Sequence, residues 1–365
     1  MPRVLVAMSG GVDSSVAAAL LVEQGYDVVG ATMKLTCHGD ELPDRPCCSL
    51  DSVNDARRVC DALGVPHYVL NLERAFTRDV VEDFAREYAR GRTPIPCVRC
   101  NTFTKFRDLV ARADAIDAEF VATGHYARVA AGALHRGVDP AKDQSYFLWG
   151  LRRSVLRRLL LPVGVLTKAE TRRRARQLGL SMVAGKTESQ DICFVPDGDH
   201  VAVVAARLGE ADPSLQPGPI QLADGTTVGV HQGFARFTIG QRRGLPGGFA
   251  EPMFVIGIEP VRQAVIIGPR QQLLGESLRA SEANWLSDRP APGTPVLVQI
   301  RHRSPAVPAI VSEAGEATFG VVFQHPVRAI TPGQSVVLYR GDHLVGGGVI
   351  ESAALGSRAL PVVAA

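Results

Sequence analysis

Residues 3–15 read Arg3-Val4-Leu5-Val6-Ala7-Met8-Ser9-Gly10-Gly11-Val12-Asp13-Ser14-Ser15, and this stretch decides the fold of the amino-terminal part of the chain. Its apolar run predicts a short buried strand that ends at the glycines. A helix-like apolar run follows over 16–22, and Gly25 closes it in a C-cap position. A strand, a glycine loop and a helix in this order direct backbone N–H groups and the positive helix end at an anion. The stretch therefore predicts a phosphate-binding loop.

The loop pattern S-G-G-V-D-S-S differs from two common nucleotide-binding motifs. It lacks the lysine of G-x-x-x-x-G-K-[ST], and it is not G-x-G-x-x-G. Gly10 and Gly11 allow the main chain to approach an anion closely, and the serine hydroxyls add donors. Asp13 is the candidate ligand for Mg²⁺, which prefers one or two carboxylates beside phosphate oxygens. The alternative is a glycine turn that only starts a Rossmann-like helix.

Length and composition limit the class of protein. At 365 residues the chain is too long for one ordinary core, so two or three domains are expected. An apolar fraction of 46% and a charged fraction of 21% are typical of soluble globular proteins. The sequence holds no apolar run of about 18 residues that would predict a membrane span. The chain enters a strand without a signal peptide, which favours a cytoplasmic protein.

Basic residues are unevenly divided between the two types. The net charge is only +3, so a nucleic-acid partner must be argued from local patches. Just five of the 40 basic residues are lysines: Lys34, Lys105, Lys142, Lys168 and Lys186. A codon bias towards arginine explains most of this scarcity. The other interpretation is that lysine remains where a compact ammonium is needed and a guanidinium would not serve.

Segment patterns predict an α/β fold class with three domains. Strands are expected at 3–8, 26–33, 66–72 and 119–124, and helices at 52–63, 75–90 and 104–115. Such alternation predicts a Rossmann-like parallel sheet with its ligand at the C-terminal strand ends. From about residue 215, short β-branched runs separated by Gly and Pro predict β structure, including a closed barrel with a turn at Gly341-Asp342. We expect domains at 1–205, 206–280 (β-rich, central) and 281–358 (C-terminal β-barrel), with linkers at 213–219 and 287–295.

Seven cysteines, an odd number, argue against a disulfide framework and for thiol chemistry or metal binding. Cys97 and Cys100 form a C-x-x-C before a predicted helix, where Arg99 and Lys105 would lower a thiol pKa. Zinc is disfavoured because Cys47-Cys48 lacks the spacing of a second ligand pair. Cys193 lies 93 positions after Cys100. The sequence leaves the roles of the remaining cysteines open, namely Cys37, Cys47, Cys48 and Cys60.

Five motifs occur together in a fixed order: S-G-G-V-D-S-S at 9–15, P-C-V-R-C-N at 96–101, A-T-G-H-Y at 122–126, K-D-Q-S-Y-F-L at 142–148 and E-S-Q-D-I-C-F at 188–194. With T-I-G-Q-R-R-G-L at 238–245, they resemble the tRNA-specific 2-thiouridylases over nearly the full chain. The resemblance implies an ATP-pyrophosphatase-loop domain at 1–205. It also implies an enzyme that adenylates O2 of the wobble uridine, position 34 of the tRNAs for Lys, Glu and Gln, and replaces it with sulfur.

The resemblance assigns residues to this reaction. Those matching the ATP contacts of the family are Ala7, Met8, Ser9, Gly10, Gly11, Val12, Asp13, Ser14, Met33 and Gly124. Cys193 matches the cysteine that takes a persulfide from a sulfur donor, either a cysteine desulfurase or a relay carrier. Cys100 matches the partner that attacks this persulfide and leaves a Cys100–Cys193 disulfide, which requires two thiols that can meet.

Cys97 stands where many family members have an aspartate, so a carboxylate base is absent there. Cys97 then acts as a resolving thiol or weak base, or Cys97, Cys100 and Cys193 hold a [4Fe–4S] cluster with one open iron.

The RNA partner is expected over the same site. Two arginine runs, 152–158 and 172–176, would bind phosphates, or else form solvated helix faces. Residues that match tRNA contacts of the family are Ile95, Pro96, Cys97, His125, Lys142, Asp143, Gln144, Arg301, His302 and Gln334. The base must be extruded for its C2 edge to be reached. Two other functions remain open: another ATP pyrophosphatase, such as a synthetase or lysidine-type ligase, and a non-catalytic ATP- and RNA-binding module.

Overall fold

The computed structural model describes residues 1–35, 50–186, 192–195, 198–355 and 358–359. Cys37, Cys47, Cys48 and the motif positions 188–191 lie outside the described residues. The chain divides into two compact units. The first unit contains 1–80, 97–194 and 341–345, and the second contains 81–96, 195–340 and 346–365. No helix in the described ranges has the length and hydropathy needed to cross a membrane.

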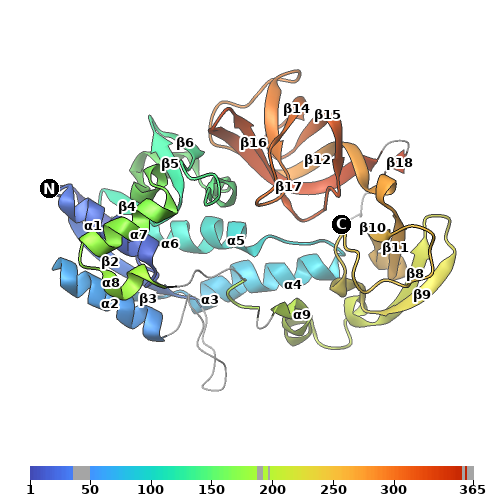
Figure 1. Cartoon of the computed structure of the whole chain (residues 1–365), viewed down its shortest axis with the longest axis horizontal. Helices are drawn as coiled ribbons and strands as arrows, with labels where there is room; N and C mark the ends of the chain where they lie inside the picture. Colours follow the sequence, from blue (N-terminus) through green and yellow to red (C-terminus); the bar gives the residue numbers. More distant parts are fainter. Residues whose placement is uncertain (36–49, 187–191, 196–197, 356–357, 360–365) are drawn as a thin grey trace. The chain divides into compact units, whose positions relative to one another are not determined.

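The first unit is built on a parallel sheet whose described strands follow the order β3-β2-β1-β4-β7 (Figure 1). The strands are β1 (Arg3–Ala7), β2 (Asp27–Lys34), β3 (His67–Asn71), β4 (Phe120–Ala122) and β7 (Leu159–Leu160). The four strands expected from the sequence are confirmed. The order reverses between β1 and β4, which is where open α/β sheets bind their ligands.

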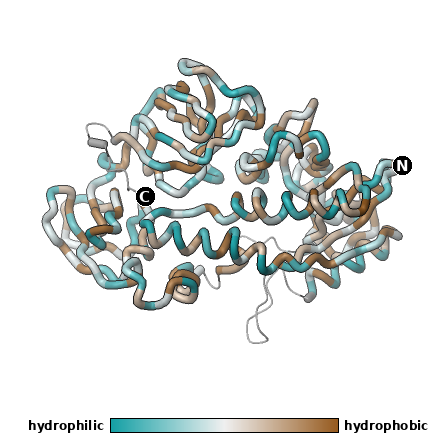
Figure 2. Tube along the Cα trace, turned by 180° about the vertical axis from the view of Figure 1, so that it is seen from behind, coloured by the Kyte–Doolittle hydropathy of each residue, from teal (hydrophilic) through white to brown (hydrophobic). Residues whose placement is uncertain are grey.

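The core of this sheet explains the continuous apolar run at the start of the chain. Val4 and Val6 of β1 and Met8, which follows the strand, are buried in one cluster with α1 (Val12–Glu23), α2 (Leu50–Leu63), α7 (Lys168–Gln177) and α8 (Ser181–Ala184). Leu5, which alternates with them, is also buried, because α6 (Arg107–Ala115) packs on β1 and β4. Figure 2 shows brown, hydrophobic stretches of chain within this unit, near the N-terminus. A strand covered on both faces has no polar side to alternate.

Two of the expected helices contain π-helical turns. The first runs through α3 (Glu73–Phe76), a π-helix at Thr77–Val81 and α4 (Glu82–Ala89). The second runs through α5 (Pro96–Arg99), a π-helix at Cys100–Phe106 and then α6. Such turns are rare and are concentrated at functional sites. The second π-helix begins at Cys100 itself.

A small hairpin, β5 (Ala127–Ala130) and β6 (Ala133–Arg136), follows β4 and was not predicted, because its strands are only four residues long. His135 of β6 pairs with His343 of β17 (His343–Leu355), so residues 341–345 belong to the first unit. Asp342 accepts hydrogen bonds from Arg128 and His135 in this hairpin. Short 3-10 turns at Ser145–Leu148, Arg153–Arg158 and Pro162–Val165 complete the unit.

The second unit contains α9 (His200–Leu208) and a sheet of described order β10-β11-β8-β9. Its strands are β8 (Pro217–Leu222), β9 (Thr227–Gln232), β10 (Met253–Glu259) and β11 (Ala264–Pro269). Ile220, Val255 and Val265 lie in its core. The expected linker at 213–219 is wrong, because Pro217 begins β8.

A closed antiparallel barrel forms the rest of the chain. Its described strands are β12 (Leu274–Trp285), β13 (Pro295–Gln299), β14 (Val307–Ala314), β15 (Phe319–Arg328), β16 (Ser335–Arg340) and β17. Pairing of β12 with both β15 and β17 closes it, and the short β18 (Arg358–Ala359) pairs with β17. The predicted C-terminal β-barrel is confirmed. The linker expected at 287–295 is wrong, because this segment joins two strands of the barrel.

In the second unit, an ion network joins Arg92 to Glu87 and Glu351. Arg92 donates from Nε to Glu87 at 2.7 Å and binds both carboxylate oxygens of Glu351 at 2.6 and 3.1 Å. The side chains of Arg92 and Glu87 are only 13% and 11% exposed. Burial tends to raise the pKa of Glu351, but hydrogen bonds from Arg92 and Ser281 outweigh it and hold the pKa below its usual value.

Replacement of Arg92 by Met is expected to lower the free energy of unfolding by about 2 kcal/mol at pH 7, because two carboxylates lose their cation. A carboxyl with a lowered folded-state pKa stabilises above its unfolded pKa and loses this stabilisation as the pH falls. The difference between wild type and Arg92→Met should therefore shrink below about pH 4. Denaturant unfolding at pH 7 and below about pH 4 measures this difference in the free energy of unfolding. Arg262→Met, which breaks an exposed pair with Glu259, is the matched control, and an equal loss in both variants would contradict the network.

Candidate active site

A cavity of about 790 Å³ lies in the first unit, at the ends of β1 and β4 where the strand order reverses. All ten residues that the family resemblance assigns to ATP line it: Ala7, Met8, Ser9, Gly10, Gly11, Val12, Asp13, Ser14, Met33 and Gly124. His125, Lys142 and Gln144, which were assigned to the tRNA, line the same cavity. Two sets of residues predicted for different ligands thus share one space.

The glycine loop is shaped by backbone contacts. Gly10 has a φ of +68°, and a Cβ there would lie 2.2 Å from the carbonyl oxygen of Ser52 in α2. The Ser14 hydroxyl accepts a hydrogen bond from the Ser9 amide at 3.1 Å, and the Ser15 hydroxyl donates to the Gly11 carbonyl at 2.8 Å. The N-cap of α1 is Gly11, which has no side chain to cap the helix. The first-turn N–H groups of α1 are therefore suited to bind an anion.

Gly124 fits the loop for a steric reason. A Cβ at this position would lie 2.5 Å from the amide nitrogen of Ser14 and 2.6 Å from the carbonyl carbon of Asp13. The end of β4 therefore packs directly on the start of α1. Any side chain at this position would push the loop and the strand apart.

The contacts of the Asp13 carboxylate differ from those expected of a Mg²⁺ ligand. Its two carboxylate oxygens each accept a hydrogen bond from Lys168 Nζ at 2.8 Å, and the Tyr126 hydroxyl donates to Oδ1 at 2.8 Å. A cation at Asp13 would meet the ammonium group already bound to it. The residues present therefore do not fit a metal ion at Asp13. Within the described ranges, no group of three or more His, Cys, Asp or Glu side chains is arranged to hold a metal ion.

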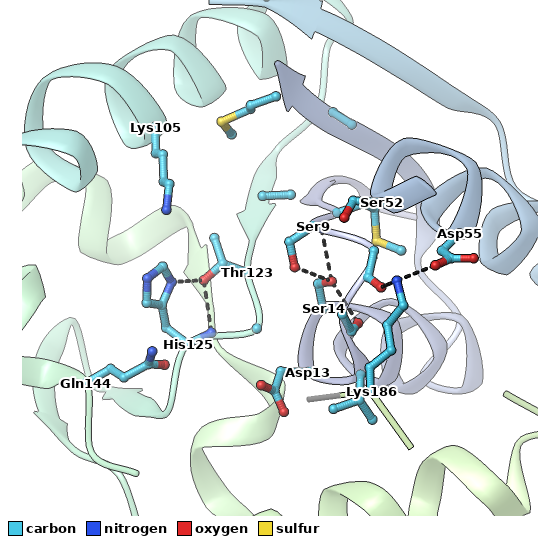
Figure 3. A pocket seen from close by; sticks show the side chains of 18 of the residues that line it. Ser9, Asp13, Ser14, Ser52, Asp55, Lys105, Thr123, His125, Gln144 and Lys186 are labelled. Atoms are coloured by element: carbon cyan, nitrogen blue, oxygen red, sulfur yellow. Dashed lines mark hydrogen bonds and ion pairs between the residues drawn. The ribbon is translucent and has the colours of Figure 1, made fainter. Parts of the chain in front are cut away.

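Figure 3 shows two walls of the cavity. Ser9, Ser14, Asp55 and Lys186 lie on one side, and Lys105, His125 and Gln144 lie on the other. The first wall comes from the glycine loop, α2 and Lys186, which follows α8. The second comes from the π-helix and the segments that follow β4 and β6.

His125 is a neutral side chain in this second wall. Its Nδ1 lies 2.8 Å from the Thr123 hydroxyl, and its ring lies 5.9 Å from that of Phe106. Burial, and then the positive charge of Lys105, lower the pKa of His125 to about 3. The imidazole is therefore uncharged at physiological pH, where it can donate or accept a hydrogen bond but does not gain a proton.

The segment Lys142-Asp143-Gln144 is held by its middle residue. Asp143 accepts hydrogen bonds from the Gly137 amide at 3.0 Å, the Ser145 amide at 3.1 Å and Arg136 at 2.8 Å. The Gln144 side-chain oxygen accepts from the Tyr126 amide at 2.9 Å. Asp143 thus fixes a turn that presents Lys142 and Gln144 to the cavity.

The three cysteines of interest all belong to the first unit, but none lines this cavity. Cys97 is exposed, Cys100 is 6% exposed and Cys193 is half-buried. Cys100 heads the π-helix that carries Lys105 and Phe106 into the cavity wall. Next to Cys193, Phe194 packs edge-on against Phe76 at 5.6 Å, and the helix α3 of Phe76 contacts the same π-helix. The segments that carry Cys100 and Cys193 thus both contact α3.

This arrangement bears on the iron–sulfur hypothesis. Cys97, Cys100 and Cys193 are all described, and they do not form a three-ligand metal cluster. The three thiols therefore do not present a preformed ligand set for the cluster.

Several other residues assigned to tRNA lie in the second unit. Arg301 donates to the backbone oxygens of Arg328 and Ala329 at 2.7 and 2.6 Å, and Gln334 donates to that of Thr93 at 2.8 Å. His302 is exposed in the turn after β13. Ile95 is half-buried and Pro96 is buried.

The arginine runs have mixed roles. Arg158 donates to the carbonyls of Ala118 and Glu119 and pairs with Asp114, and Arg174 pairs with Glu23 at 2.8 Å. Arg152 and Arg157 are exposed. Part of each run therefore stabilises the fold, and other members, Arg152 and Arg157 in the first run and Arg176 in the second, face solvent.

Three lysines of the cavity wall were not assigned to the site from the sequence. They are Lys105, Lys168 and Lys186. The signal that could have found them is the scarcity of lysine, because four of the five lysines line the cavity.

Comparisons with known proteins follow the same domain order. A tRNA methyl transferase HUP domain matches residues 2–197, a tRNA methyl transferase PRC-barrel domain matches 208–269, and an aminomethyltransferase beta-barrel domain matches 275–350. These matches correspond to the parallel sheet, the central sheet and the barrel.

The chain is also similar over its length to proteins named tRNA-specific 2-thiouridylase MnmA. The one from Rhodospirillum rubrum is 48% identical over 366 residues, which cover 95% of this chain and 96% of the relative. Those from Rhodospirillum centenum and Carboxydothermus hydrogenoformans are each 47% identical. They cover 95% and 96% of this chain, and 91% and 97% of their own lengths, respectively.

Proposed function

The chain belongs to the tRNA-specific 2-thiouridylase family, and we propose that it uses ATP to replace O2 of the wobble uridine, position 34, with sulfur. The protein is accordingly an enzyme, a tRNA sulfurtransferase. The observation that carries the proposal is the single cavity in which a phosphate loop faces His125, Lys142 and Gln144. A nucleotide and a nucleobase have room to react there. The substrates that we propose are the tRNAs for Lys, Glu and Gln.

The first step activates a poor leaving group. Uridine O2 attacks the α-phosphorus of ATP, pyrophosphate leaves with its electron pair, and the N3 proton is lost to solvent or a base. The loop 9–14 and the start of α1 stabilise the departing pyrophosphate through their N–H groups. His125 holds the base as a neutral hydrogen-bonding group, since its low pKa prevents it from accepting the proton. Mg²⁺ would accompany the phosphates and offset their charge.

The second step delivers sulfur. A donor protein, either a cysteine desulfurase or a relay carrier, leaves a persulfide on Cys193. The terminal sulfur attacks C2 and AMP departs, which leaves C2 joined to Cys193 through a disulfide. Cys100 thiolate then attacks the Cys193 sulfur, so 2-thiouridine leaves as the thiolate and a Cys100–Cys193 disulfide forms. An external thiol reductant restores both cysteines.

Cys97 takes no part in the transfer of sulfur to C2 in this scheme. It occupies the place of the usual aspartate and is exposed, while Cys100 is buried. We propose that Cys97 is a resolving thiol that can open the Cys100–Cys193 disulfide, or a weak base.

Binding of tRNA is expected to depend steeply on salt, because the exposed arginines contact phosphates. Replacement of Arg152 or Arg157 by Ala should each lower the slope of log affinity against log salt by about one. Filter binding or fluorescence anisotropy at several salt concentrations measures this slope. Arg174→Ala, whose guanidinium already pairs with Glu23, is the control and should leave the slope unchanged. Equal affinity at low and moderate salt would contradict a phosphate-binding surface.

The proposed function is tested in a bacterial strain that lacks its own 2-thiouridylase. Expression of this chain should restore sulfur at C2 of the wobble uridine in the tRNAs for Lys, Glu and Gln, read by mass spectrometry of digested tRNA. Sulfur at another base, or lysine joined to a cytidine, would replace this proposal with a different ATP-dependent modification.

A further inference from the structure

We propose that Lys168 and Lys186 bind the pyrophosphate part of ATP from two sides of the glycine loop, and that Asp13 and Asp55 are positioning residues for the two ammonium groups. The inference rests on the proposed function, because it names the side chains that hold the nucleotide. It also supplies positive charge beside Asp13, where the sequence had suggested a metal ion.

The distribution of basic residues is the first observation. The chain has 40 lysines and arginines, and only five are lysines. Four of those five line the cavity, whereas Arg58 is the sole arginine among its described lining residues. A codon bias explains why lysine is rare, but it does not explain why the remaining lysines gather in one place. A compact ammonium with three donors suits a narrow phosphate site in which a planar guanidinium has a fixed fork geometry.

Lys168 is held firmly beside the loop. It is the first residue of α7, whose start is fixed by a capping box between Thr167 and Glu170. Its amide donates to Asp139 at 2.9 Å, and its Nζ lies 5.6 Å from the centre of the Tyr126 ring. Only 10% of its side chain is exposed. Its Nζ donates to both carboxylate oxygens of Asp13, which lies two residues after Gly11 of the loop.

Lys186 reaches the other side of the same loop. Its Nζ donates to the carbonyl oxygen of Gly10 at 3.2 Å and pairs with Asp55 of α2. Figure 3 shows its side chain running beside the start of α1 to this pair. The side chain is 34% exposed, so the ammonium is accessible from the cavity.

The carboxylates make both ammonium groups ready for an anion. A lysine side chain loses rotamer freedom when it is fixed, and here that loss has already occurred before ATP arrives. The Lys168–Asp13 pair is neutral as a whole, whereas Asp55 is shared by Lys186 and Arg58, so that side of the loop carries a net positive charge before ATP binds. Pyrophosphate can then accept hydrogen bonds from the two positioned ammonium groups and from the N–H groups of α1. Charge-assisted hydrogen bonds of this kind are short and strong.

The alternative is that each lysine only neutralises its carboxylate. A double variant separates the two roles, because Asp13→Asn removes the need for neutralisation. If Lys168 only neutralises Asp13, Lys168→Met should bind pyrophosphate poorly, and the double variant Asp13→Asn/Lys168→Met should regain the wild-type affinity. If Lys168 contacts phosphate, the affinity of the double variant for pyrophosphate should stay below that of the wild type.

The test is calorimetric titration of the full chain with ATP, inorganic pyrophosphate and AMP. Lys168→Met and Lys186→Met should each bind ATP and pyrophosphate about 10- to 100-fold more weakly. Their affinity for AMP should stay within about twofold of wild type, which also shows that the variants are folded. The doubles Asp13→Asn/Lys168→Met and Asp55→Asn/Lys186→Met should remain at least about tenfold weaker for pyrophosphate. Recovery of wild-type affinity in both doubles would overturn the proposal.

A second measurement uses only the wild-type protein. Pyrophosphate should protect Lys168 and Lys186 from acylation, read by peptide mass spectrometry, but should not protect Lys34, which is absent from the cavity lining. Equal labelling with and without pyrophosphate would also overturn the proposal.

Failure of this inference is distinguishable from failure of the proposed function. A wild-type protein that thiolates tRNA while all lysine variants bind pyrophosphate normally would overturn only the lysine roles. A wild-type protein that binds pyrophosphate through these lysines but transfers no sulfur would overturn only the proposed reaction. Absence of any binding of ATP and pyrophosphate would overturn both.

Discussion

Cys100→Ser is expected to reduce thiolation, measured in a single turnover without an external thiol reductant, by at least about 10³-fold while ATP binding stays unchanged. A serine hydroxyl cannot open the disulfide that joins C2 to Cys193, because it is a far weaker nucleophile at neutral pH. The reaction should therefore stop with tRNA covalently attached to Cys193. Denaturing gel electrophoresis detects this adduct, and a thiol reductant should release 2-thiouridine from it. Cys193→Ser should show equally low activity without any adduct, since it cannot carry the persulfide.

Cys60→Ala is the matched control for both variants. Burial, and then the nearby negative charge of Asp61, raise the pKa of the Cys60 thiol to about 11, so this thiol is not ionised at neutral pH. The variant should lose some stability, because Cys60 is fully buried in the core, but its rate of thiolation should not change. Wild-type activity in Cys100→Ser would contradict the sulfur-transfer scheme.

Gly124→Ala is expected to weaken ATP binding by about 100-fold, because the added methyl group has no space at the switch point of the sheet. A Cβ there would lie 2.5 Å from the Ser14 amide nitrogen, which is shorter than any normal contact. The start of α1 and its N–H groups would have to shift away from β4. Titration with ATP measures the loss, and circular dichroism checks that the fold remains.

Gly247→Ala is the control for this prediction. Nothing lies within 4 Å of a Cβ at Gly247, and its φ is not in the left-handed region, so the variant should bind ATP as wild type does. Unchanged ATP affinity in Gly124→Ala would mean that the nucleotide does not occupy the crevice between β1 and β4.

The sequence predicts the first unit well, because its signals are local. The apolar run of β1 and the following glycines identify a buried strand and an anion-binding loop without knowledge of distant contacts. The barrel turn at Gly341-Asp342 is confirmed between β16 and β17 for the same reason. The linkers predicted at 213–219 and 287–295 are wrong, because the local signal there is ambiguous. Proline and glycine break periodicity equally at domain borders and at strand ends, so composition alone does not separate the two.

The site is less predictable, because its side chains come from distant segments. Asp13 looks like a metal ligand in its own segment, but its partner Lys168 lies 155 positions away. Asp143 belongs to a motif that resembles a tRNA contact, and its carboxylate is used within its own turn. The π-helix at Cys100 contains Asn101, which donates to the Phe147 carbonyl at 3.2 Å, 46 positions along the chain. Such contacts are set by the fold and leave no periodic pattern.

The central claim is that ATP activates O2 of the uridine inside the cavity of the first unit, and isotope transfer tests it most directly. An anticodon stem-loop with ¹⁸O at O2 of the wobble uridine is thiolated in a single turnover, and the released AMP is examined by mass spectrometry. The account predicts one ¹⁸O atom in each AMP, since the bond between O2 and the α-phosphorus survives when C2 takes sulfur. Thiolated product accompanied by unlabelled AMP, with the ¹⁸O in water, would contradict it.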